Sequence, residues 1–211
     1  MISLFIDTSS KNIIVAVIKN KDILSLIMEA NDNTLSERIF PLLIKAMNEA
    51  NKDIKAIEKV YVVNGPGSFT GVRVGVTIAK TIAWSLNIPL IPISSLEVLA
   101  STQYDSDYLI PYIDARRGYV YAGIYDNNLN NIVEDQHIEL SEIINKMPKK
   151  GKFCFVGYDK IETNLNIIDP QINLLRIINK HYNDVGVNPH TLVPNYLKLT
   201  EAEENLKKET V

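Results

Sequence analysis

The sequence predicts an α/β protein built from two similar lobes. Short β-branched runs alternate with segments of helical periodicity, and an apolar fraction of 46% is sufficient for a core of normal size. The two halves also begin alike, because residues 5–7 (Phe-Ile-Asp) correspond to residues 112–114 (Tyr-Ile-Asp), each followed by a polar turn and a second strand. A repeat of this kind indicates a duplicated unit. We therefore expect residues 1–103 to form the first lobe and residues 104–211 a smaller second lobe.

The first lobe is expected to begin with an antiparallel meander. Residues 2–6, 13–18 and 23–28 are rich in β-branched side chains and are separated by polar turns, as successive strands are. Further strands are expected at 59–63 and at 88–93, the second of which contains two prolines and is placed at a sheet edge. With two intervening helices, the order is strand-strand-strand-helix-strand-helix-strand, which is compatible with a ribonuclease-H-like sheet.

In the second lobe, the predicted elements after the repeated hairpin are fewer. A helix is expected from Ser141, a strand at 153–156, and a last helix at 194–207 that can return to the first lobe. The pair Arg116-Arg117 falls in the turn of the repeated hairpin. It is interpreted as a solvated turn, with phosphate contact as the alternative.

The first helix is predicted to begin after Thr34, since Thr34 and Glu37 have the spacing of a capping box. Phe40 and Ile44 lie off the main apolar face and form a second apolar stripe. A helix that serves one core needs one stripe, so the second stripe either contacts another protein or packs under a loop. The residues of the main face are Leu35, Ile39, Leu42, Leu43, Ala46 and Met47.

Residues 64–75 (Asn-Gly-Pro-Gly-Ser-Phe-Thr-Gly-Val-Arg-Val-Gly) join a predicted strand to the second helix, expected at 71–86. A glycine-rich loop before a helix is a common way to bind phosphate. The glycine spacing, however, matches neither the Walker nor the dinucleotide fingerprint. The residues that remain as cofactor-binding candidates are Asp7, Gly65, Gly67 and Ser68.

Along the second helix, Gly71, Gly75, Ala79 and Ala83 recur every four residues. A ridge with so little side chain lets another backbone approach closely. Two interpretations stay open: the helix packs between a sheet and another helix of the same chain, or the ridge meets another protein. For the second interpretation, the interface candidates of both helices are Ser36, Phe40, Ile44, Gly71, Arg73, Gly75, Val76, Thr77, Ala79 and Lys80.

Composition argues against several classes of function. A net charge of −3 gives no global positive field for nucleic acid or anionic lipid, and a single cysteine cannot form an internal disulfide. The three histidines lack the spacing of metal ligands. There is no apolar run of about 18 residues and no basic start before an apolar segment, so neither a membrane span nor a signal peptide is expected. The expected location is the cytoplasm.

Several segments together resemble the TsaB (YeaZ) family, bacterial proteins of threonylcarbamoyladenosine (t6A) synthesis. The specific part is the Gly-Pro-Gly-Ser-Phe-Thr-Gly-x-Arg-x-Gly run, and the resemblance covers nearly the whole chain. It implies two actin-like (ASKHA, ribonuclease-H-like) lobes with mixed sheets flanked by helices. One departure is Leu35, where family members usually carry histidine. The segments that carry the resemblance are 5–9, 35–37 leading to 41–42, 64–75, 113–121, and the ending 194–203.

The resemblance implies a function in tRNA modification, at adenosine 37 of tRNAs that read codons starting with A. Family members pair with the catalytic paralogue TsaD through first-lobe helices, act with the ATPase TsaE, and also form homodimers. The resemblance implies no cofactor on this chain alone and leaves ATP or ADP at the subunit boundary open. Contact with tRNA is expected to be indirect.

The catalytic paralogue carries a His-x-x-x-His metal motif, and the matching segment here is Ser95-Leu96-Glu97-Val98-Leu99. Neither Ser95 nor Leu99 supplies a nitrogen ligand, so no metal and no catalytic residue are expected. The leading hypothesis is therefore a non-catalytic subunit that binds and activates TsaD. The alternatives are a stand-alone actin-like ATPase or phosphotransferase using Asp7 and the glycine loop, and a purely homodimeric binding protein.

Overall fold

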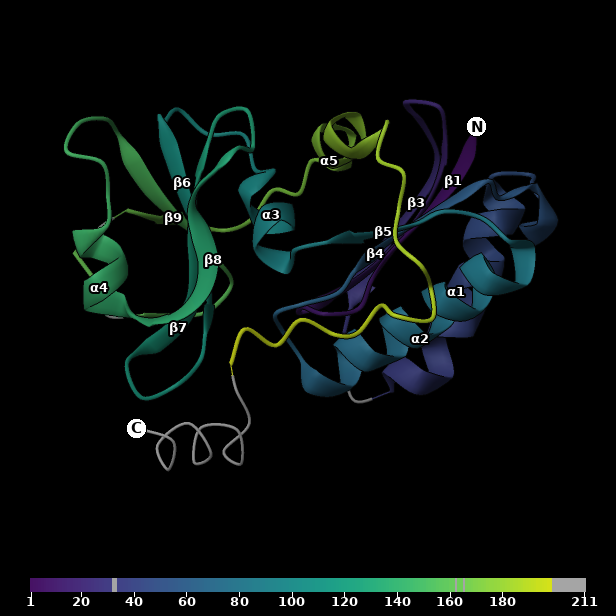
Figure 1. Ribbon diagram of the computed structural model, residues 1–211, viewed down its shortest axis with the longest axis horizontal. Helices are drawn as coiled ribbons and strands as arrows, with labels where there is room; N and C mark the ends of the chain where they lie inside the picture. Colours follow the sequence, from purple (N-terminus) through teal and green to yellow (C-terminus); the bar gives the residue numbers. More distant parts are fainter. Residues whose placement is uncertain (32–33, 162, 165, 199–211) are drawn as a thin grey trace.

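The computed structural model describes residues 1–31, 34–161, 163–164 and 166–198, and the structural statements below refer to these. Two five-stranded sheets alternate with helices in layers (Figure 1). Two helices lie outside the first sheet, two lie between the sheets, and one lies outside the second sheet. In chain order the helices are α1 (Leu35–Glu49), α2 (Phe69–Leu86), α3 (Ser95–Ala100), α4 (Leu140–Asn145) and α5 (Leu174–His181), with a short 3₁₀ turn at Ile54–Ala56.

The first sheet has the strand order β3-β2-β1-β4-β5. β1 to β3 form the predicted antiparallel meander, whereas β4 and β5 run parallel to β1. β1, β2 and β4 are buried nearly throughout, because helices cover both faces of the sheet. The predicted element order and the edge position of the fifth strand are confirmed. The strands are β1 (Ile2–Asp7), β2 (Asn12–Lys19), β3 (Asp22–Ala30), β4 (Lys59–Val63) and β5 (Leu90–Ile93).

The second sheet repeats this topology with the order β10-β9-β6-β7-β8. β6 to β8 are antiparallel, β9 is parallel to β6, and β10 is parallel to β9. β1 and β6 both end at the repeated aspartate, Asp7 and Asp114, so the duplication and the actin-like two-lobe fold are confirmed. The predicted boundary at residues 103/104 stays a prediction. The strands are β6 (Tyr108–Asp114), β7 (Tyr119–Asp126), β8 (Asn131–Glu139), β9 (Phe153–Val156) and β10 (Ile167–Ile168).

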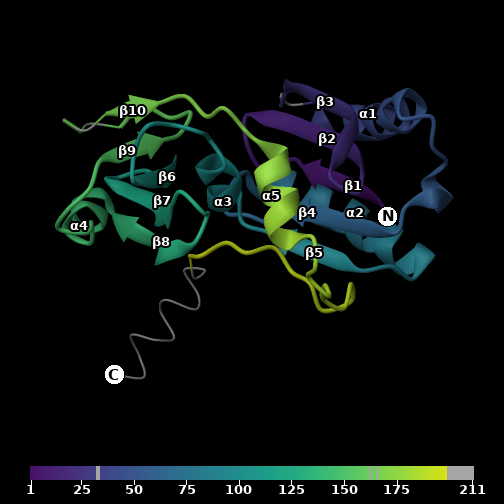
Figure 2. The same cartoon turned by 90° about the horizontal axis from the view of Figure 1, so that it is seen from above.

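The two lobes share a hydrophobic core. It joins one face of the first sheet, including Phe5 and Tyr61, to α3, to α5 and to Leu109 and Val156 of the second sheet. Figure 2 shows α5 lying over the first sheet beside α3. A separate core lies between the first sheet and α1 and α2, and a third lies between the second sheet and α4. The lobes are therefore packed together through common helices.

After α5 the chain returns across the first lobe as a segment that we call the C-terminal strap, residues 187–198 (yellow in Figure 1). Val187 forms an antiparallel bridge with Leu90, and the Asn195 N–H donates to the Asn64 carbonyl at 2.7 Å. The helix predicted at 194–207 lies largely outside the described residues. Its described part, 194–198, is irregular rather than helical.

Two predicted helix starts and one predicted helix cap differ from the structure in detail. α1 begins at Leu35 as predicted, but Thr34 has φ −103° and ψ 14°, and its side chain makes no capping hydrogen bond, so the capping box is not formed. α2 begins at Phe69 rather than Gly71, because the Ser68 hydroxyl caps it by accepting the Gly71 N–H at 3.2 Å. α4 begins one residue before Ser141. No helix of the described chain is long and apolar enough to cross a bilayer.

Candidate functional site

A cavity of about 310 Å³ lies between the lobes, where the turn after β1 meets the start of α2. The first lobe contributes Asp7 and Ser9, and the second lobe contributes Tyr112 and Asp159. α3 supplies further lining side chains from between the sheets. Of the four cofactor-binding candidates, Asp7, Gly67 and Ser68 line this cavity, whereas Gly65 is not part of its lining.

The Asp7 carboxyl is buried, with 2% of the residue exposed. The Ser9 N–H and O–H both donate to Asp7 Oδ1, at 2.8 and 2.7 Å, and the Ser95 hydroxyl donates to Ser9 Oγ at 3.0 Å. Burial raises the pKa of Asp7 to about 6, although the two hydrogen bonds from Ser9 lower it in part. A carboxyl titrating so close to neutrality inside a cavity is a feature of functional sites.

The glycine loop packs on the first hairpin instead of forming an open phosphate cradle. A Cβ on Gly67 would lie 2.3 Å from the Ser9 carbonyl oxygen, and one on Gly65 would lie 2.4 Å from that of Asn195. The Ser68 N–H already donates to the Ser9 carbonyl at 2.8 Å. The glycines therefore permit close backbone contact within the chain, and this use of the loop argues against the phosphate interpretation.

The small-residue ridge of α2 faces the chain's own first strand. A Cβ on Gly71 would lie 2.0 Å from the Thr8 carbonyl oxygen, and one on Gly75 would lie 2.4 Å from Thr8 Oγ1. Ala79 and Ala83 are fully buried in the core between the first sheet and α1 and α2. Gly71, Gly75 and Ala79 are thus buried within the chain, which favours the first interpretation of the ridge, and their contact with a partner stays a prediction. Their spacing does mark a close approach, but the approaching backbone belongs to the same chain.

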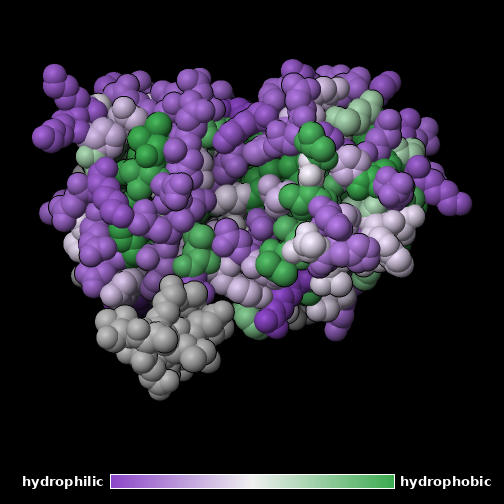
Figure 3. Space-filling model, viewed as in Figure 1, coloured by the Kyte–Doolittle hydropathy of each residue, from purple (hydrophilic) through white to green (hydrophobic). Residues whose placement is uncertain are grey.

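A different part of α1 and α2 is open to solvent. Phe40 and Ile44, the second stripe, are 58% and 62% exposed. A groove of about 430 Å³ runs between the two helices, and hydrophobic surface is visible over the first lobe on the right of Figure 3. Ser36, Arg73 and Thr77 are also exposed. The residues that line the α1–α2 groove are Ser36, Ile39, Phe40, Arg73, Val74, Thr77, Ile78, Thr81 and Ile82.

The strap lies along the border of this groove. It packs against the two remaining interface candidates, Val76 and Lys80. Lys80 Nζ donates to the Leu192 carbonyl at 2.7 Å, and Val76 is only 3% exposed beside the strap. The Arg73 guanidinium lies 3.7 Å from the centroid of the Phe69 ring, and its Nε donates to the Tyr196 hydroxyl at 2.7 Å. Sequence reasoning missed this role of Tyr196. Its only signal was that the residue falls in the family's characteristic ending.

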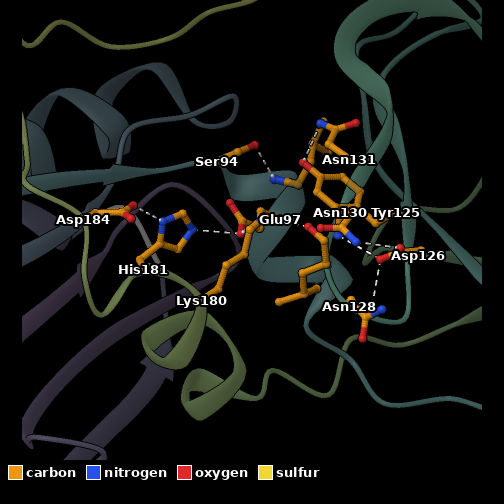
Figure 4. A network of polar contacts seen from close by, with 12 residues as sticks. Ser94, Glu97, Tyr125, Asp126, Asn128, Asn130, Asn131, Lys180, His181 and Asp184 are labelled. Atoms are coloured by element: carbon orange, nitrogen blue, oxygen red, sulfur yellow. Dashed lines mark hydrogen bonds and ion pairs between the residues drawn. The ribbon is translucent and has the colours of Figure 1, made fainter.

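A polar network ties α3 to α5 between the lobes (Figure 4). Glu97 Oε1 contacts Lys180 Nζ at 2.8 Å and His181 Nε2 at 2.9 Å, and His181 Nδ1 contacts Asp184 at 2.6 Å. Burial raises the pKa of Glu97, but the hydrogen bonds and charges of His181 and Lys180 outweigh it and hold that pKa below its ordinary value. Burial lowers the pKa of His181, and its two carboxylate partners raise it by more. On the opposite side of α3, Ser95 and Leu99 line the cavity.

The second lobe joins the network through Asp135. The Ser94 hydroxyl and the Tyr125 hydroxyl both donate to the Asp135 carboxylate, the latter at 2.7 Å. Burial raises the pKa of Asp135, and these hydrogen bonds lower it in part. α3 is therefore held by polar contacts at two points, from Ser94 at its N-terminus to β8 and from Glu97 in its middle to α5.

Comparison with known proteins gives a consistent family. The model of the family TsaD, tRNA N6-adenosine threonylcarbamoyltransferase, matches residues 29–205. The TsaB protein of Bacillus subtilis is 34% identical over 96% of each chain, and that of Buchnera aphidicola (subspecies Schizaphis graminum) is 34% identical over 74% of this chain and 78% of its own.

Solved structures show the same fold at lower identity. A Pseudomonas aeruginosa protein described as similar to peptidase YeaZ is 20% identical, with a TM-score of 0.82 over 93% of this chain and 99% of its own. YeaZ from the same organism, also 20% identical, has a TM-score of 0.76 over 92% and 100%. With the duplicated sheets and the glycine run, these relationships show that the chain belongs to the TsaB (YeaZ) family of tRNA threonylcarbamoyladenosine biosynthesis proteins.

Proposed function

We propose that this chain acts in t6A biosynthesis as a non-catalytic subunit, which binds TsaD through the α1–α2 groove and activates it together with the ATPase TsaE. The observation that carries the proposal is the exposed apolar stripe of Phe40 and Ile44 beside the groove. In this proposal tRNA is bound by the complex and not directly by this chain, and ATP or ADP belongs to the subunit boundary.

The groove has the chemistry of a helix-docking surface. Phe40 and Ile44 are one helical turn apart, so they present a continuous apolar strip, and Val74 and Ile82 of α2 are only half-buried. Full burial of such side chains contributes about 1.5–3 kcal/mol each. Helices of a partner that lie in this groove would complete a bundle with α1 and α2. The exposed Arg73 at its border adds a charged group of the type enriched at binding hot spots.

Two observations support a non-catalytic role. The positions that match the paralogue's metal histidines are Ser95 and Leu99, and both line the cavity without a nitrogen ligand to offer. The rival ATPase or phosphotransferase needs N–H donors for phosphate, yet those of Ser68 and Gly71 are used inside the chain. The homodimeric alternative would use the same groove, so it competes with TsaD binding for that surface.

The docking experiment uses the double variant Phe40→Glu/Ile44→Glu and the control Ile132→Glu. Ile132 is also exposed, at 47%, but lies on β8 of the second lobe. Loss of two hot-spot contacts should weaken binding to purified TsaD by roughly 100-fold or more, whereas the control should bind within about twofold of wild type. Circular dichroism establishes that the variants are folded. A folded double variant that binds TsaD normally contradicts the proposal.

The activity experiment reconstitutes t6A formation from TsaD, TsaE, tRNA, ATP and the donor threonylcarbamoyl-adenylate. Omitting this chain, or supplying the double variant, should abolish the product. ATP turnover by the purified chain alone, lost in Asp7→Ala, would instead support the rival enzyme. Light scattering with and without TsaD distinguishes a homodimer that persists from one that TsaD displaces. Stoichiometric zinc or iron in the purified chain would overturn the non-catalytic assignment.

A further inference from the structure

We infer that the cavity between the lobes binds a small organic cation, a ligand with a protonated amine or amidine group, and that Asp7 is its counter-ion. Two independent observations point to a ligand: the cavity itself, and a buried carboxylate with an oxygen left for it. Both hydrogen bonds from Ser9 go to Asp7 Oδ1, and Asp7 Oδ2 accepts none from the described residues. The inference does not depend on the docking of TsaD.

The hydrogen bonds around the cavity leave it rich in acceptors. The Ser95 hydroxyl donates to Ser9 and the Ser9 hydroxyl donates to Asp7. Both hydroxyl protons are therefore directed toward the Asp7 carboxylate and not toward a ligand. The Asn31 amide donates to the carbonyls of Thr8 and Ser10 at 3.1 and 2.9 Å. With these donors already used, a ligand that pairs with Asp7 has to bring its own N–H or O–H group.

The charge of the lining favours a cation for the same reason. Among the described residues that line the cavity, Lys11 is the one cation and Asp7 and Asp159 are the anions. Lys11 Nζ already pairs with Asp159 at 2.9 Å and donates to the Tyr158 carbonyl at 2.8 Å. Asp7 is left without a positive partner, so a monovalent cation would neutralise the site, whereas a phosphate would lie beside an uncompensated carboxylate.

The rest of the wall suits the carbon skeleton of such a ligand. Ile14, Val98, Leu99 and Ile113 line the cavity with apolar surface. A volume of about 310 Å³ is at the small end of the range for organic-ligand pockets. An apolar body with one terminal ammonium or amidinium group would therefore place its polar end at Asp7 and its body against α3.

The binding test uses benzamidinium and n-butylammonium as probes, with benzamide and n-butanol as neutral counterparts of similar shape. Amide resonances of Ser9, Gly67 and Ser95 in ¹H–¹⁵N spectra report occupancy of the cavity. At least one cation should bind about tenfold or more tightly than its neutral counterpart at pH 7.5, because a charge-assisted bond to a desolvated carboxylate exceeds a neutral one. Its affinity should fall as the pH drops through 6, where Asp7 becomes protonated.

Asp7→Asn keeps the shape of the side chain and should weaken cation binding by about tenfold or more. Asp114→Asn is the matched control, since it removes the same charge from the exposed, equivalent position of the second lobe and should leave binding within about twofold. If Asp7→Asn does not fold, ¹³C titration of the wild-type Asp7 carboxyl decides, because a bound cation should lower its pKa. Binding of inorganic phosphate or Mg-ATP in preference to both cations, or binding of neither cation at these resonances, overturns the inference.

Discussion

The turns after β1 and β6 occupy equivalent places in two sheets of the same order, yet their aspartates differ. Asp7 is buried beside a cavity, whereas Asp114 is exposed and its carboxylate accepts the Arg116 N–H at 2.9 Å within a solvated turn. In the first lobe, the start of α2 covers the turn. Between β9 and β10 of the second lobe, residues 157–161, 163–164 and 166 contain no helix. The two lobes thus share the same strand order. The additional helix α2 buries the turn after β1, whereas the equivalent turn after β6 stays exposed to solvent.

The largest effect is expected from Gly71→Ala. Its Cβ would lie 2.0 Å from the Thr8 carbonyl oxygen, so α2 or the first turn has to move, and the free energy of unfolding should fall by about 3 kcal/mol or more. Gly118→Ala in the second turn meets no atom within 4 Å and should cost about 1 kcal/mol, from its φ of +80° alone. Urea unfolding of both variants measures the difference. If both variants lost the same unfolding free energy, the packing of α2 on the first turn would not be what distinguishes the two turns.

Asp7→Asn should stabilise the protein at pH 7, by about 1–3 kcal/mol. The pKa of Asp7 rises from 3.8 to about 6 on folding, so the native state holds a proton that the unfolded state releases, and stability falls as the pH rises from 4 to 6. The gain from the variant should therefore vanish at pH 4 and be complete above pH 6. Asp114→Asn should change the unfolding free energy by less than about 0.5 kcal/mol at either pH. A gain that is equal at pH 4 and pH 7 would exclude burial of the charge as its source.

The smallest of the three effects concerns α3 and α5, the helices that follow the last strand of each sheet. Glu97→Gln should lower the free energy of unfolding by about 1–2 kcal/mol near pH 6, since it removes the carboxylate shared by Lys180 and His181. The raised pKa of His181 means that its contribution is present at low pH and is lost as the pH rises through the folded value, so the loss should shrink by pH 9. The pKa of Glu97 is lowered in the folded state, so the stabilisation by its carboxylate is lost as the pH falls through that folded value. The difference between Glu97→Gln and wild type should therefore also shrink at acidic pH.

Glu142→Gln on α4 is the control for that measurement, because Glu142 is exposed on the outer helix of the second lobe. Its effect should stay within about 0.5 kcal/mol at every pH. A pH-independent loss in Glu97→Gln would show that packing, and not the charge network, joins the two helices.

Local patterns were sufficient to predict most of the fold. Alternation and turn residues located the strands, and helical periodicity correctly separated Phe40 and Ile44 from the buried face of α1. The capping box failed because the spacing of Thr34 and Glu37 does not fix the backbone dihedrals at Thr34. The small-residue ridge signalled a close contact but not its partner, since Thr8 is remote in sequence from Gly71. The burial of Asp7 and the course of the strap depend on tertiary packing, which periodicity does not encode.

The strap, together with the residues between α5 and the strap, has a consequence for how the chain is made. The Lys59 ammonium, on a central strand of the first sheet, is bound by the carbonyls of Tyr182 and Asp184, and the first of these is 123 residues further along the chain. The start of the glycine loop likewise depends on a late residue, because the Asn64 carbonyl accepts the Asn195 N–H. During synthesis on the ribosome, the first lobe emerges first but obtains these contacts last. It therefore lacks them until the second lobe has been translated. Factors that meet the nascent chain will encounter a first lobe that still lacks its edge contacts.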